Sequence, residues 1–165
     1  METVASSGSA VVSLPSDTEI LITREFAAPA HLVYKAFTTP DLVKRWWSAK
    51  RGEVTIAEID LRVGGKWRWV MVTDDGFEVA FHGEYREIKP NERIVHTEVY
   101  EGAPGGDENP ALITMNLAEK DGRTTLTVLT AMATKEGRDL ILESGMEAGM
   151  QDAYELLEEV AISLK

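Results

Sequence analysis

The feature that most constrains how this chain folds is a change in the spacing of its apolar residues near position 54. From Val54 to Met132, apolar and polar residues alternate with a period of about two, and turn-forming residues recur about every ten positions. Short turns join neighbouring strands in opposite directions, so this stretch predicts an antiparallel meander rather than a parallel fold. Six strands are expected at residues 54–61, 66–73, 78–88, 93–100, 112–118 and 124–131, with a long loop at 102–110.

Helical spacing lies on the N-terminal side of this meander. Residues 19–26 alternate as a strand does, and Pro29 then fits the first turn of a short helix. A second short helix is expected at residues 41–47. Residues 1–18 are rich in Ser, Gly and Ala and carry neither a basic segment nor a long apolar run, so they predict a disordered tail rather than a secretory signal.

Residues 134–165 predict a long amphipathic helix. Apolar residues recur at intervals of three or four over residues 142–164. Ser144 precedes Glu147 with the spacing of a capping box, so one helix from about Lys135 and two helical pieces both fit the pattern. The segment carries eight acidic and three basic side chains. This excess of acidic residues favours a hydrated outer face of the helix, and an acidic docking surface is the alternative.

These elements allow few compact arrangements and predict one α+β domain of the helix-grip kind over residues 19–165. A curved seven-stranded antiparallel sheet would have one apolar face, and the long C-terminal helix would cover it, with two short helices after the first strand. A curved sheet cannot follow a straight helix along its whole length, so an internal cavity is expected between them. A binding function would reside in this cavity.

Composition excludes several classes of function. The chain has 165 residues and no cysteine, which excludes a cysteine nucleophile and any metal site ligated by cysteine. A net charge of −11 argues against nucleic acid or a membrane surface as the main partner, because both are bound through clustered Lys and Arg. No apolar run approaches the roughly 18 residues of a membrane span. We expect a cytoplasmic protein.

Aromatic residues on two expected strands predict the wall of the cavity. Trp67 and Trp69 share one face of their strand, as Phe81 and Tyr85 do on the next. Gly83, between these last two, leaves a gap that could admit a ligand or the approaching helix. A fully packed core is the alternative interpretation of the same pattern. The predicted ligand-binding residues are Trp47, Trp67, Trp69, Phe81, Tyr85, Met146 and Met150.

Met146 and Met150 lie one turn apart on the expected C-terminal helix, with Gly145 and Gly149 beside them. Glycine costs about 1 kcal/mol in a helix interior, so the pair suggests that the backbone passes close to a strand or a ligand. Methionine suits a pocket that accepts several shapes, although it fills a core equally well.

No catalytic residue, metal site or cofactor is predicted. His31, His82 and His96 lack the spacing of a helical metal site, and no Gly-x-Ser-x-Gly motif is present. His31 is expected on an exposed helical turn and His82 on the outer face of a strand, whereas the face of His96 is ambiguous.

The chain also carries nine short motifs whose order resembles that of a known family. They are FAAP at 26–29, VYKAF at 33–37, PDL at 40–42, RWW at 45–47, DLRVGGKW at 60–67, GEYREIKP at 83–90, RIV at 93–95, GRT at 122–124 and GMEAG at 145–149. In this order they resemble the Aha1-like family, single domains similar to the C-terminal domain of the activator of Hsp90 ATPase. This family is part of the Bet v 1/START-like (SRPBCC) superfamily, and the resemblance covers residues 19–163.

The resemblance implies the helix-grip fold and a superfamily that mostly binds apolar ligands between helix and sheet. The expected function is therefore non-enzymatic binding of a small hydrophobic or aromatic ligand by a monomer or homodimer. One alternative is a co-chaperone-like module that binds Hsp90 or another protein partner. The other is an enzyme of cyclase or hydrolase type acting on a polyketide-like substrate, which an entirely apolar cavity would exclude.

Overall fold

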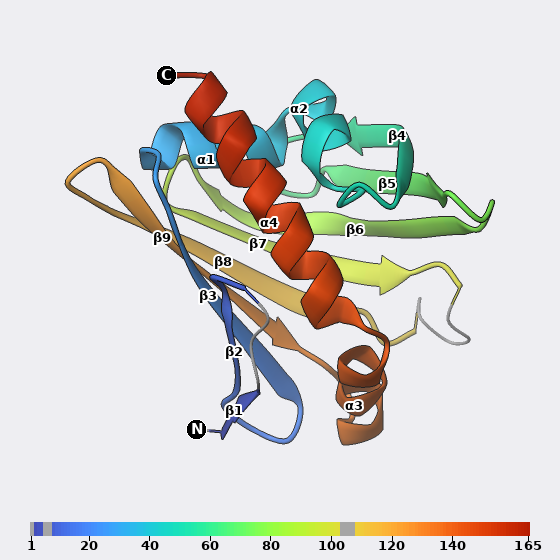
Figure 1. The fold of residues 1–165 in the computed structure, drawn as a ribbon. Helices are drawn as coiled ribbons and strands as arrows, with labels where there is room; N and C mark the ends of the chain where they lie inside the picture. The colour runs from blue at the N-terminus through green and yellow to red at the C-terminus, as the bar shows by residue number, and fades with distance from the viewer. Residues whose placement is uncertain (1, 5–7, 103–107) are drawn as a thin grey trace.

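A computed structural model describes residues 2–4, 8–102 and 108–165, and these form a single antiparallel sheet and four helices (Figure 1). The nine strands of this described part run in the order β1-β2-β3-β9-β8-β7-β6-β5-β4. The strands are β1 (Glu2–Val4), β2 (Val11–Leu14), β3 (Glu19–Phe26), β4 (Gly52–Ile59), β5 (Lys66–Thr73), β6 (Glu78–Lys89), β7 (Arg93–Tyr100), β8 (Ala111–Lys120) and β9 (Arg123–Ala131). The helices are α1 (Ala30–Thr38), α2 (Pro40–Trp46), α3 (Lys135–Glu143) and α4 (Met146–Ser163).

The alternation of the sequence predicts the sheet correctly from β3 onward. Strands β3 to β9 correspond to the seven expected strands, and two short helices follow the first of them as predicted. The hairpins between β6 and β7 and between β8 and β9 contain Asn91 and Asp121, both with positive φ, as tight turns require. Of the expected 102–110 loop, residues 103–107 lie outside the described part of the chain.

The count of seven strands and the disordered tail at residues 1–18 are both corrected by the structure. Strand β2 pairs with β3 in antiparallel register, and β1 pairs with β2. Val12 has no exposed surface. The free edge of β3 offers unpaired backbone groups, so even a short apolar run gains hydrogen bonds and burial there. Residues 1 and 5–7 of the expected tail lie outside the described residues.

The C-terminal segment forms two helices, so the single long helix is wrong and the two-piece alternative is correct. Thr134 caps α3 by accepting a hydrogen bond from the Gly137 amide at 3.0 Å. Gly145 has φ +84°, a left-handed conformation that breaks the helix before α4 begins. Figure 1 shows α4 crossing one face of the sheet, with α1 and α2 beside its C-terminal half and α3 at its N-terminal end.

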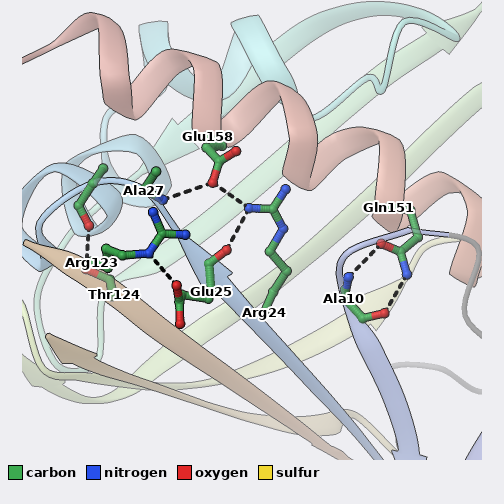
Figure 2. A network of polar contacts seen from close by, with 9 residues as sticks. Ala10, Arg24, Glu25, Ala27, Arg123, Thr124, Gln151 and Glu158 are labelled. Carbon is green, nitrogen blue, oxygen red and sulfur yellow. Dashed lines mark hydrogen bonds and ion pairs between the residues drawn. The ribbon is translucent and has the colours of Figure 1, made fainter. Parts of the chain in front are cut away.

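Polar contacts hold α4 to the N-terminal edge of the sheet (Figure 2). Glu158 accepts hydrogen bonds from the Arg24 guanidinium at 2.8 Å and from the Ala27 amide at 2.9 Å. Gln151, about two turns earlier, donates to the Ala10 carbonyl at 2.7 Å and accepts from the Ala10 amide at 2.9 Å. These side chains anchor α4 over β2 and β3.

Replacing Arg24 with methionine is expected to destabilise the fold by about 2 kcal/mol. The Arg24 side chain is only 4% exposed and lies 4.5 Å from the centroid of the Phe26 ring, so methionine keeps the packing stem but removes the charge that Glu158 needs. The loss stays below the roughly 3–5 kcal/mol of a fully buried pair, because Glu158 is 27% exposed and retains the Ala27 amide. Urea unfolding measures the change.

Arg123→Met is the matched control for this prediction. Arg123 pairs with Glu25, but both side chains are more than half exposed, so the expected loss is below about 1 kcal/mol. Equal losses for the two variants would contradict the assignment of Arg24 as a buried anchor.

Within the described residues, none of the helices combines the length and the apolar character needed to cross a bilayer.

Candidate functional site

A cavity of about 980 Å³ lies between the sheet and α4. Its walls come from β3 and β5 to β9 on one side and from all four helices and the turn after α2 on the other. The volume is at the upper end of the range of roughly 300–1,000 Å³ that is typical of small-molecule sites. The cavity expected from the mismatch between a curved sheet and a straight helix is therefore present.

All seven residues predicted from the sequence line this one cavity. Strands β5 and β6 contribute four of them through their alternation, α4 contributes two methionines, and the turn after α2 contributes one tryptophan. They are Trp47, Trp67, Trp69, Phe81, Tyr85, Met146 and Met150. Their contact with a ligand stays a prediction.

The aromatic side of the cavity is a cluster of rings centred on Trp69. The Trp69 ring lies 5.6 Å from that of Trp47 and 5.5 Å from that of Trp67, and Trp47 lies 6.0 Å from Phe81, all in edge-to-face geometry. Such pairs contribute about 0.5–1.5 kcal/mol each beyond their burial. Because each ring is held by its neighbours, this wall is rigid.

Gly83 does not open a gap in the wall. A Cβ atom at Gly83 would lie 1.8 Å from the Thr97 carbonyl oxygen and 2.6 Å from Trp67 Nε1, so the backbone of β7 and the Trp67 indole already fill that space. The expectation that a ligand or the helix enters there is wrong. The ladder between β6 and β7 is interrupted at this point, where the Glu84 amide donates to the Thr97 hydroxyl at 2.9 Å.

Gly149 has the opposite surroundings. It lines the cavity, and a Cβ atom there would meet no atom within 4 Å. Gly145, at the break between α3 and α4, likewise has open space beside it. The expected close approach of a strand to this glycine pair is therefore wrong, and what the glycine at position 149 provides is room.

The cavity wall is less apolar than the aromatic pattern suggests, and four of its polar side chains are titratable groups whose pKa is shifted by burial. They are Tyr85, His96, Glu98 and Tyr154. The sequence pattern leaves the face of His96 open, and Glu98 and Tyr154 are not among the predicted residues. Alternation along β7 was the available signal, since it places His96 and Glu98 on the same face as Ile94, which also lines the cavity.

Burial controls the charge of these groups. Desolvation lowers the pKa of His96 to about 4, so its imidazole is neutral near pH 7, and its Nδ1 lies 3.1 Å from the Thr97 carbonyl oxygen. Desolvation raises the pKa of Glu98 to about 7. It also raises the pKa of the Tyr85 and Tyr154 phenols, and the negative field of Glu98 adds to the rise at Tyr154.

The other two histidines lie away from the cavity. His31 is exposed in the first turn of α1, and His82 lies 3.0 Å through Nδ1 from a Glu101 carboxylate oxygen that also pairs with Arg68. These positions agree with the expected exposed turn and outer strand face. No cluster of three or more metal-ligating side chains occurs within residues 2–4, 8–102 and 108–165.

A curved antiparallel sheet that encloses a cavity against a C-terminal helix defines a helix-grip domain of the Bet v 1/START-like kind. The family model described as Activator of Hsp90 ATPase homolog 1-like protein matches residues 27–161. The chain therefore belongs to this family.

Solved structures share the same fold. A Rhodobacter sphaeroides protein superposes with a TM-score of 0.83 at 28% identity, covering 92% of this chain and 97% of its own. A Nitrosomonas europaea protein gives 0.80 at 23% identity, with 92% and 98% covered. A Mycobacterium smegmatis protein gives 0.80 at 22% identity, with 96% of each chain covered. Among curated proteins, none matches this sequence.

Proposed function

We propose that the protein binds a small hydrophobic or aromatic molecule in the cavity between the sheet and α4 and releases it unchanged. The observation that carries this proposal is the cavity of about 980 Å³ with a rigid aromatic cluster on one wall and Met146 and Met150 on the other. Rigid rings provide contact area at little entropic cost, and the two methionines adapt to the shape of the bound molecule.

The polar groups of the wall support binding over catalysis. An activated nucleophile needs a base within hydrogen-bond reach, and no hydrogen bond joins Tyr85, His96, Glu98 and Tyr154 to one another among the described residues. The cavity is nevertheless not entirely apolar, so the condition that would exclude an enzyme is not met.

Native mass spectrometry of freshly purified protein tests the proposal directly, because it reports both a retained small molecule and the number of subunits. A mass excess that disappears on denaturation is the expected result. Catalytic turnover of the released compound by the protein would favour the enzyme instead.

A variant that fills the cavity provides the sharper test. A Cβ atom at Gly149 would meet no atom within 4 Å, and Gly149 lines the cavity. Gly149→Leu should therefore fold and yet weaken binding of the neutral fluorophore N-phenylnaphthylamine on the order of tenfold or more. Ala148→Leu adds the same side chain one position away, on the exposed face of α4 and outside the cavity wall. Unchanged affinity in Gly149→Leu would show that the fluorophore binds elsewhere.

A co-chaperone-like role is the second candidate, favoured by the family to which the chain belongs and by the acidic α4. Two acidic residues of this helix already pair within the chain, Asp152 with Arg51 and Glu158 with Arg24. An Hsp90 ATPase assay with and without the protein decides this point, since an unchanged rate together with no co-purification would count against it.

A further inference from the structure

Glu98 is an unpaired carboxyl group on the wall of an otherwise largely apolar cavity. Within the described part of the chain it makes no hydrogen bond and no ion pair. Across the ladder it faces Ala111 of β8, a side chain too short to reach it. The residue keeps some accessible surface, because its side chain borders the cavity. A polar group placed in this way is available to whatever occupies the cavity.

An unpaired carboxylate in such surroundings is costly, and protonation or a cation can remove the cost. The protein supplies no cation for this purpose. Among the described residues of the wall, Arg51 carries the one permanent positive charge, and it pairs at 2.7 Å with Asp152 in an exposed position. A positive charge for Glu98 must therefore come from the ligand.

The aromatic cluster beside the cavity favours the same kind of ligand. The faces of Trp and Phe rings attract an ammonium group within about 6 Å of the ring centroid. A chain with a net charge of −11 also raises the local concentration of cations over that of anions. Both effects act in the same direction as Glu98.

We propose that Glu98 recognises a ligand that joins an apolar or aromatic body to a protonated amine, with the ammonium group paired to this carboxylate and the body held by the aromatic cluster. This inference rests on the proposed binding function and adds the chemical class of the ligand. A cavity that only excluded water would not distinguish an amine from a neutral molecule of the same shape.

The test compares two probes of nearly equal size, naphthylethylamine and naphthylethanol, by isothermal titration calorimetry. The wild-type protein should bind the amine on the order of tenfold more tightly than the alcohol at about pH 8. Glu98→Gln should abolish this preference, because glutamine keeps the shape of the side chain but has no charge to pair with the ammonium group. Glu92→Gln is the matched control, since it makes the same change of charge at an exposed residue in the turn after β6, outside the cavity wall, and should retain the preference.

The outcomes separate the two proposals. Equal affinity of the wild-type protein for both probes, with Gly149→Leu weakening both, would overturn the role of Glu98 and leave the cavity as a binding site. Failure of both probes to bind would contradict the proposed function and the inference that depends on it. Loss of the amine preference in Glu92→Gln as well would mean that net charge, and not Glu98, carries it.

The pH dependence gives a second readout. The titratable groups of the cavity wall besides Glu98 are Arg51, Tyr85, His96, Tyr100 and Tyr154. With a pKa of about 7 for Glu98, affinity for the amine should rise on the order of tenfold from about pH 6 to about pH 8, while an alkylamine stays protonated. His96, whose pKa is lowered to about 4, stays neutral over this range. A flat profile would overturn the assignment.

Discussion

Replacing Gly83 with alanine is expected to destabilise the folded protein by about 4 kcal/mol or more. The new Cβ atom would lie 1.8 Å from the carbonyl oxygen of Thr97, far inside van der Waals contact. That oxygen belongs to the backbone of β7, so it cannot move away unless the pairing of β6 with β7 opens further. Trp67 would also have to shift, because its Nε1 atom lies 2.6 Å from the same position. Chemical unfolding measures the loss of stability. If the variant does not fold at all, the yield of folded protein measures it.

Gly149→Ala is the matched control, because the same substitution meets no atom within 4 Å there. It should stabilise α4 by up to about 1 kcal/mol, the usual difference between the two residues in a helix interior. If Gly83→Ala destabilises the protein and Gly149→Ala stabilises it, the space around each glycine decides the change in stability, since the substitution is the same. A loss below about 1 kcal/mol for Gly83→Ala would contradict this prediction, because it would mean that the backbone of β7 can move away from the new Cβ atom at little cost.

The sequence predicts the sheet well because alternation is a local signal. Each strand from β3 to β9 repeats apolar residues with a period of two, and residues such as Asn91 and Asp121 mark the hairpins that join them. Strand β2 has no such signal, since four residues are too few to show a period. Its structure depends on the free edge of β3, which a reading of residues 1–18 alone does not reveal.

The candidate site is predictable for its large side chains and much less so for its polar ones. Trp67 and Trp69 can be placed inside because a tryptophan on an alternating strand gains most by burial. Glu98 breaks that rule, since a charged residue on a strand usually faces water. Alternation along β7 places it on the same face as Ile94, but both faces of this strand carry apolar and polar residues, so the sequence alone does not show which face is buried. The surroundings of the two glycines could not be predicted either. The sequence does not show that Gly83 faces the backbone of Thr97, whereas Gly149 faces open space.

Glu98→Gln should make the folded protein more stable above neutral pH, by about 3 kcal/mol relative to the wild type. Burial raises the pKa of Glu98 from its ordinary value near 4.5 to about 7. The folded state therefore holds this proton more tightly than the unfolded state does. The resulting stabilisation is fully present below about pH 4.5 and is lost as the pH rises through about 7. Glutamine mimics the protonated form and does not titrate, so the two proteins should match at low pH and diverge as the pH rises.

Urea unfolding at several pH values between about 4.5 and 8 measures this divergence as a difference between the two proteins. His96, with a pKa lowered to about 4, loses its stabilising effect as the pH falls, but it does so in both proteins and cancels from the difference. Glu92→Gln is the control, because it removes one negative charge at an exposed side chain outside the cavity wall. A pH-independent difference for Glu98→Gln would show that the carboxyl group is hydrated in the cavity. The expected divergence would instead mean that ionised Glu98 destabilises the folded protein, and that pairing with a cationic ligand would remove this cost.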